Sequence, residues 1–142
     1  MKIYVDRIPE DGLELETTYE PSLLEVGRPD LHVAGPLRLH GRATREAKEL
    51  FVSAEIDYHL TLACARCLTE IDRQSSKALF LHYDTARQQV VDITDDVRQE
   101  IVLEYPLAAL CRPDCRGLCP TCGVNWNDGT CAHQRNQGAP RV

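Results

Sequence analysis

Apolar and polar residues alternate strictly along residues 49–64, ELFVSAEIDYHLTLAC. The even positions, from Leu50 to Cys64, carry apolar side chains and Tyr58, whereas the odd positions from Phe51 to Thr61 are mostly polar. A period of two residues predicts a long β-strand with one face towards the core. The strand ends on Cys64, and the sequence CARC, which predicts a tight turn, follows at once.

Looser alternation on both sides of this strand predicts a sheet. The expected strands cover residues 2–8, 13–19, 31–35, 37–45 and 70–84. Turn residues at 9–12 separate the first two strands, and Gly35-Pro36 is expected to break the next pair. We expect residues 70–84 to pair back onto the long strand. Successive strands with short turns are typical of an antiparallel sheet or a small barrel.

The pattern changes to a helical period after residue 92. Ile93, Val97 and Ile101 recur at intervals of four residues, which predicts one helix over residues 94–105. Thr94 is a plausible N-cap, and Pro106 is expected to end the helix near Tyr105.

Seven cysteines and a histidine supply candidate metal ligands. They are Cys64, Cys67, Cys111, Cys115, Cys119, Cys122, Cys131 and His133. Structural zinc is bound by four such groups in a tetrahedron, so the set is sufficient for two complete sites. We therefore expect one or two Zn²⁺ ions.

The spacing of the cysteines suggests how they are shared. Two residues separate Cys119 from Cys122 in CPTCG, and Gly123 allows the backbone turn that lets both thiolates reach one ion. Cys131 and His133 are the nearest second pair. The CARC cysteines would then join Cys111 and Cys115, although CARC with Cys119 and Cys122 is an alternative that the sequence leaves open.

The cysteines could also serve purposes other than zinc binding. CARC could be a thiol redox motif, but such motifs lie at strand-to-helix junctions, and here a strand is predicted to follow. Disulfides are rare in reducing compartments, and iron could occupy an all-cysteine site. The first residues, MKIYVDRIPEDG, lack the continuous apolar stretch of a signal peptide, and the chain has no apolar run that could span a bilayer. We therefore expect a cytoplasmic protein without a membrane partner.

Charge and motif content bear on the function. The net charge is −6, divided into about −8 over residues 1–110 and about +2 over residues 111–142, which disfavours extensive RNA binding by the first part. The sequence has no catalytic triad arrangement and no phosphate loop. Four-ligand metal sites leave no position for a substrate, so neither an enzyme nor a small-molecule substrate is expected.

These features together predict an α+β fold. It is mainly an antiparallel β sheet or small barrel with one main helix and a zinc-stapled C-terminal segment. The expected domains are residues 1–110, mainly β with the helix near 94–105, a cysteine-rich segment 111–133 packed on them, and a disordered tail 134–142.

CARC after a long strand, a helix leading into EYPLAALC, and CxxxCxGLCPxCGxN together resemble the YceD family of bacterial proteins. The resemblance covers roughly residues 20–133. Family members commonly carry Leu-Asn after the CG, where this chain has Asn125-Trp126-Asn127. They often end the cysteine-rich segment with two cysteines, where this chain has Cys131 and His133.

The resemblance implies a non-enzymatic factor in the synthesis, processing or stability of large-subunit ribosomal RNA. Two kinds of partner are then possible. Ribosomal RNA would be contacted by the basic C-terminal segment, residues 111–142, through Arg112, Arg116, Arg135 and Trp126. A basic large-subunit ribosomal protein would instead be held by the acidic sheet, as in an RNA-free adaptor. Trp126 itself either packs over the metal site or stacks on a base.

Overall fold

The computed structural model describes residues 1–133. The chain forms two compact units. The sheet unit consists of Met1–Thr61 and Asp72–Tyr105. The cysteine unit consists of Leu62–Ile71 and the chain from Pro106 onwards. The second unit thus contains both the CARC turn and the predicted segment 111–133. The predicted tail 134–142 lies outside the described residues.

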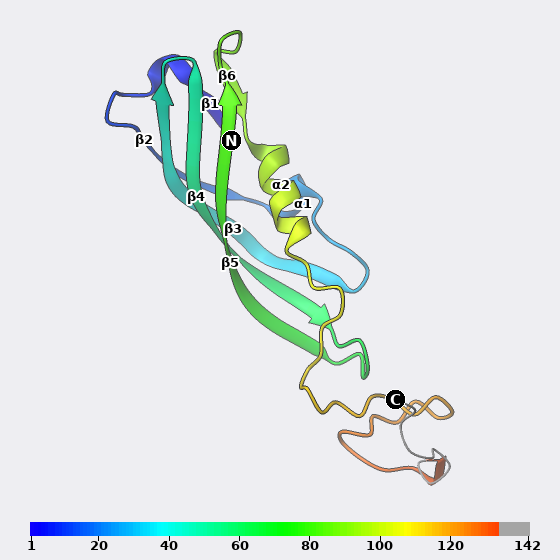
Figure 1. Ribbon diagram of the computed structural model, residues 1–142. Coiled ribbons are helices and arrows are strands. Elements are labelled where there is room, and N and C mark those ends of the chain that lie inside the picture. The colour runs from blue at the N-terminus through cyan, green and yellow to red at the C-terminus, as the bar shows by residue number, and fades with distance from the viewer. Residues whose placement is uncertain (134–142) are drawn as a thin grey trace. The chain divides into compact units, whose positions relative to one another are not determined.

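A four-stranded sheet is the main element of the fold (Figure 1). Its strands are β2 (Leu13–Tyr19), β3 (Leu31–Glu46), β4 (Glu49–Ala63) and β5 (Glu70–Asp84), in the spatial order β2-β3-β4-β5. β2 runs antiparallel to β3, with Leu13 opposite Ala43 and Tyr19 opposite Leu37. Over residues 1–133 the sheet is open, so of the two predicted architectures the antiparallel sheet is confirmed and the barrel is wrong.

β3 is one continuous strand, and the expected break at Gly35-Pro36 is wrong. The last pair between β2 and β3 is Tyr19 with Leu37, so Gly35 and Pro36 lie beyond the stretch that β2 covers. Proline is tolerated at such a position because its missing N–H breaks no ladder on that side. Within the paired stretch Gly41 is required, since a Cβ there would lie 2.3 Å from the Ser53 carbonyl oxygen of β4.

The first strand is shorter than predicted. β1 covers Lys2–Tyr4 and is followed by a 3-10 helix at Val5–Arg7. β1 pairs antiparallel with β6 (Val90–Asp92), a strand that the sequence pattern missed because three residues are too few to show alternation. The short helix α1 (Pro21–Leu24) was also missed.

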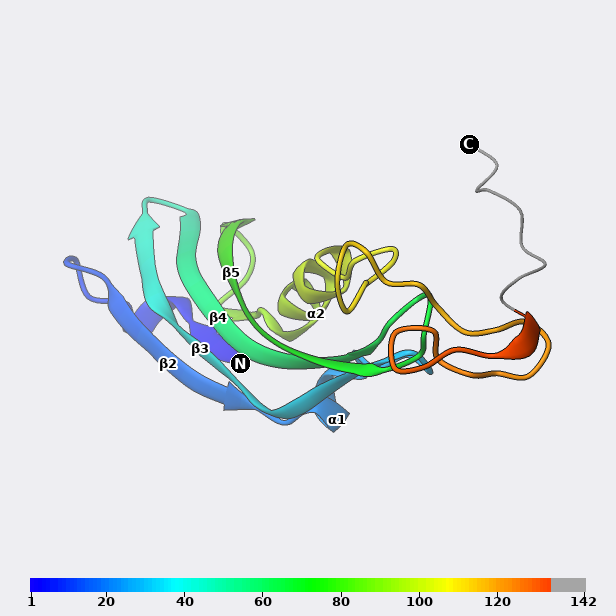
Figure 2. The same cartoon turned by 90° about the horizontal axis from the view of Figure 1, so that it is seen from below.

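The core of the sheet unit lies between the sheet and the main helix, α2 (Thr94–Leu103), which runs beside β5 in both views (Figures 1 and 2). Ile93, Val97 and Ile101 are completely buried, as the helical stripe predicted. The even positions of β4 are buried and the odd positions are exposed or half-buried, which confirms the alternation that predicted this strand.

The start of α2 differs in detail from the expectation. The N-cap is Ile93 rather than Thr94, and the Asp92 carboxylate accepts hydrogen bonds from the Thr94 backbone N–H at 3.1 Å and the Thr94 hydroxyl at 2.6 Å. Asp92 thus provides the acceptor that was expected of Thr94. The helix ends at Leu103, two residues before Tyr105. No helix among residues 1–133 is both long and apolar enough to cross a membrane.

Candidate metal centre

The CARC turn begins where β4 ends and is closed by backbone hydrogen bonds. The Cys64 N–H donates to the Thr69 carbonyl at 2.9 Å, and the Leu68 N–H donates to the Cys64 carbonyl at 3.0 Å. Leu68 adopts a left-handed conformation with φ of 60°. The Ala65 N–H donates to the Ala109 carbonyl at 2.8 Å, which brings the segment before Cys111 alongside the turn.

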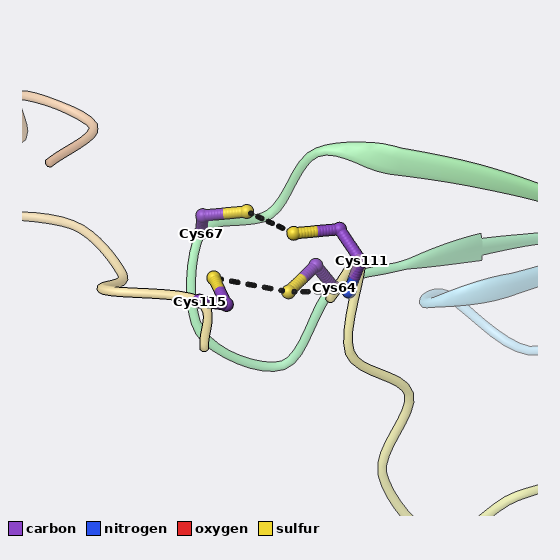
Figure 3. Close-up of side chains that lie close together, drawn as sticks. All are labelled: Cys64, Cys67, Cys111 and Cys115. Carbon is purple, nitrogen blue, oxygen red and sulfur yellow. Dashed lines mark hydrogen bonds between the residues drawn. The ribbon is translucent and has the colours of Figure 1, made fainter. Parts of the chain in front are cut away.

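Four sulfur atoms converge there, from Cys64, Cys67, Cys111 and Cys115 (Figure 3). All four lie within 4.8 Å of one another; the Sγ atoms of Cys64 and Cys115 are 3.8 Å apart, and those of Cys67 and Cys111 are 3.6 Å apart. In a tetrahedron with zinc–sulfur bonds of about 2.3 Å, the sulfur atoms are separated by about 3.8 Å. A disulfide needs about 2.05 Å. The spacing therefore fits a tetrahedral metal ion.

The environment of this first cluster divides its thiols into two kinds. Burial opposes ionisation of Cys64, but backbone N–H groups of Cys67, Cys111 and Arg66 lower its pKa to about 6. The Thr69 hydroxyl and backbone N–H lower the pKa of Cys67. Loss of hydration around the sulfur of Cys111 and the neighbouring thiols raise its pKa to about 12. Four thiolates this close repel one another, and a divalent cation would remove that repulsion.

A second cluster follows directly along the chain. Cys119, Cys122, Cys131 and His133 each bring one ligand atom within 4.8 Å of the others. The Gly123 N–H donates to the Cys119 carbonyl at 2.9 Å, and Gly123 has a φ of 74°, as the CPTCG pattern predicted. Backbone N–H groups of Cys122 and Thr121 lower the pKa of Cys119 to about 6. Three thiols and an imidazole are a common zinc ligand set.

The structure thus groups the eight candidate residues in one of the two ways left open by the sequence. CARC joins Cys111 and Cys115, and the alternative with Cys119 and Cys122 is not the arrangement formed. That these residues hold a metal stays a prediction, and the residues present suit one in number, spacing and chemistry.

Asn127 is a contributor to the site whose role the sequence left undefined. Its Nδ2 donates to the Cys115 sulfur at 3.3 Å and to the Asn125 Oδ1 at 2.8 Å, and its Oδ1 accepts the Arg116 N–H at 2.9 Å. Asn127 lies in the loop between the two ligand pairs of the second cluster, yet it hydrogen-bonds to a sulfur of the first. The loop of one cluster therefore orients a candidate ligand of the other.

Trp126 is half-buried within the same loop. Its indole N–H points to the Cys131 sulfur at 3.4 Å, and its backbone N–H donates to the Gly117 carbonyl at 2.9 Å. These contacts fit a packing role at the second cluster. Arg112 and Arg116 are exposed, and Arg135 lies outside the described residues.

Comparison with known proteins identifies the relatives of this chain. Residues 80–142 match the family described as large ribosomal RNA subunit accumulation protein YceD. The resemblance to the YceD family is confirmed. The matched region contains α2 and six of the candidate ligands, Cys111, Cys115, Cys119, Cys122, Cys131 and His133. No solved structure is significantly similar to the chain.

Three relatives show how far the similarity extends. The uncharacterized protein YlbN of Bacillus subtilis is 27% identical, over 96% of this chain and 87% of its own length. An uncharacterized protein of Mycobacterium tuberculosis is 30% identical, over 77% of this chain and 60% of its own length. A maize protein named large ribosomal RNA subunit accumulation protein YCED homolog 1, chloroplastic, is 43% identical over 61 residues, which are 41% of this chain and 20% of the maize protein.

Proposed function

We propose that this protein is a non-enzymatic zinc-binding factor that promotes the accumulation of large-subunit ribosomal RNA. The match of residues 80–142 to the YceD family carries the proposal, because the family is described by that role. The maize relative has the same role in its name. The part of this chain that matches the family is also the part that contains six of the eight candidate ligands.

Zinc is the metal that suits the two clusters best. Thiolate and imidazole ligands in a tetrahedron are typical of structural zinc, and the sulfur spacing of the first cluster agrees with it. Each cluster provides four protein ligands, so a bound ion would have no open position for a substrate. This closed arrangement supports a structural role for the metal rather than a catalytic one.

The thiol redox alternative has one observation in its favour and one against it. The low pKa of Cys64 is typical of a reactive thiol. Cys64 is completely buried, however, so a substrate disulfide could not reach its sulfur without opening the cluster. The same N–H groups that lower its pKa are those expected around a metal-bound thiolate.

Depletion and rescue test the proposed role. Cells depleted of the protein should contain less large-subunit than small-subunit ribosomal RNA, and the wild-type gene should restore the ratio. The double variant Cys64→Ser/Cys67→Ser should fail to restore it, whereas Leu23→Ala, at an exposed side chain of the sheet unit, should restore it fully. An unchanged RNA ratio on depletion would contradict the role.

Metal analysis of the purified protein tests the zinc separately. Two zinc ions per chain are expected, one for each cluster. The His133→Ala variant should lose one of them, because it removes a ligand from the second cluster alone. Iron in place of zinc, or a metal-free chain with an exchange activity that depends on Cys64, would favour the other interpretations.

A further inference from the structure

The two faces of the sheet differ in what lies against them. Lys77 and Tyr83 of β5 contact Glu100 and Asp96 of α2, so the odd positions of β5 face the helix. The even positions therefore point to the opposite side, which we call the outer face. Exposed or half-buried residues occupy this face along all four strands.

Aromatic side chains gather at one end of the outer face. Phe51 of β4 stacks on His82 of β5, with ring centroids 4.8 Å apart and an angle of 16° between the planes. Phe80 lies on the same face and is 78% exposed. Since the rest of the outer face is largely polar, an exposed aromatic group of this kind is typical of a contact surface.

A hollow of about 260 Å³ opens between these rings. Its outer-face lining consists of Arg42, Thr44, Phe51, Ser53, Phe80 and His82. Sites for small molecules usually measure about 300–1,000 Å³. The hollow is therefore of a size for one long side chain of a partner rather than for a free ligand.

Carboxylates occupy nearby positions on the same face, although none of them lines the hollow itself. The nearby outer-face positions of the four strands carry Glu14, Glu46, Glu49, Glu55 and Asp84. Three of these carboxylates already have a basic neighbour, since Glu14 lies 3.7 Å from Arg42, Glu49 lies 3.5 Å from His82 and Glu55 lies 3.7 Å from His40. Glu46 and Asp84 form no ion pair within residues 1–133, and Arg42 also donates to the Asp11 carbonyl. This end of the outer face is thus aromatic at its centre and negative at its rim.

We propose that this hollow binds an arginine side chain of a basic partner protein. A guanidinium group stacks on aromatic rings and pairs with carboxylates, and the site offers both. Arginine suits it better than lysine because the planar guanidinium stacks on a ring and donates to two acceptors at once. The negative rim repels phosphates, which disfavours RNA as the occupant.

The inference rests on the proposed function and adds a partner of defined chemistry to it. A factor that promotes ribosomal RNA accumulation would act here through a basic protein.

Binding of a fluorescent peptide to the full-length, zinc-loaded protein tests the inference. The probes are a short peptide with several arginines, the same peptide with lysine at those positions, and a single-stranded oligouridylate. The arginine peptide should bind most tightly, and its affinity should fall as salt is added. The oligouridylate should bind weakly and should not displace the peptide.

Phe80→Ala should weaken binding of the arginine peptide by about tenfold, since cation–π contacts account for changes of that order. Glu49→Arg should weaken it further and flatten the salt dependence. Leu23→Ala and Glu20→Arg are the matched controls, because Leu23 is 71% exposed and both residues lie outside the outer face. Both controls should leave the affinity unchanged, and circular dichroism checks that every variant is folded.

Three results would overturn the inference: no peptide binding at low salt, an affinity that Phe80→Ala leaves unchanged, or an oligouridylate that competes for the hollow. Rescue of ribosomal RNA accumulation by the wild type, together with any of these results, would reject the inference and leave the proposed function standing. Peptide binding without a ribosomal RNA phenotype would support the binding site and reject the proposed role in ribosomal RNA accumulation.

Discussion

In the sheet unit, Leu39, Ile56 and Ile101 are completely buried among other apolar side chains, whereas in the cysteine unit the buried hydrophobic side chains are Leu62 and four of the seven cysteines. Ile71 and Leu118, which pack against the first cluster, are only partly buried. The sheet unit therefore has an ordinary hydrophobic core, whereas the buried interior of the cysteine unit consists mainly of cysteine side chains. A segment with so few buried apolar groups needs another source of stability, which the proposed metal ions provide.

The difference also appears in the hydrogen bonds. The sheet unit uses strand ladders and helices, whereas the cysteine unit uses turns whose N–H groups point at sulfur atoms. Those N–H groups favour thiolates, and thiolates without a cation repel one another. The geometry of the cysteine unit is thus suited to the metal-bound state, whereas that of the sheet unit does not depend on metal.

Removal of metal should separate the two units most strongly. A chelator should abolish amide protection in residues 62–71 and 106–133 and leave β2, β3 and α2 protected. Structural zinc contributes about 10–16 kcal/mol in small zinc-binding peptides, so the effect on the cysteine unit should be large. Hydrogen exchange followed by mass spectrometry measures this directly. Equal loss of protection in both units would show that their stabilities are not separate.

A cavity in the sheet core should have the opposite distribution. Ile56→Ala removes a completely buried side chain from β4 and should lower the free energy of unfolding of the sheet unit by about 2–5 kcal/mol. The zinc content of the folded protein should not change. Phe80→Ala is the control, because its ring is 78% exposed and its removal should alter stability by less than about 0.5 kcal/mol. Chemical denaturation gives both values, and metal loss in Ile56→Ala would contradict the expectation.

Asn127→Ala should reveal how the two clusters are connected. The substitution removes the donor to the Cys115 sulfur and the acceptor for the Arg116 N–H. Loss of such a contact to a ligand typically costs about 10–100-fold in metal affinity, so the first cluster should release zinc more readily. Competition with a chromophoric chelator measures the release. Asp128→Ala, at the exposed neighbouring position, should have no effect; an equal effect would assign the loss to the loop as a whole.

The smallest effect is expected at the start of α2. The hydrogen bond from the Thr94 hydroxyl is the main cause of the lowered pKa of Asp92. Burial acts in the opposite direction, and the hydrogen bond from the Thr94 backbone N–H lowers the pKa further. A lowered pKa means that Asp92 stabilises the fold above its unfolded pKa of about 3.9, and that this contribution is lost as the pH falls through the folded value.

Asp92→Asn should therefore cost about 1 kcal/mol near neutral pH, typical of a lost helix cap. The difference from the wild type should disappear in acid, below both pKa values. Thermal unfolding at a series of pH values measures the difference. A cost that stays constant into acid would mean that the charge of Asp92 is not what stabilises the helix.

Much of the sheet unit could be predicted from local patterns. The alternation in residues 49–64 and the stripe of Ile93, Val97 and Ile101 each follow from the geometry of a single element. Features without a local signature were missed. β6 has three residues, and the continuity of β3 through Gly35-Pro36 depends on where β2 stops pairing.

The candidate site shows the same division. The sequence by itself determined the eight candidate ligands and the left-handed turn at Gly123, because residue type and spacing are local properties. Only the tertiary structure decided that CARC joins Cys111 and Cys115 rather than Cys119 and Cys122, since both closures span more than forty residues and the chain between them can accommodate either. The tertiary structure also decided the role of Asn127. Its hydrogen bond to Cys115 connects the loop of one cluster to a sulfur of the other, and residue spacing alone does not predict such a contact.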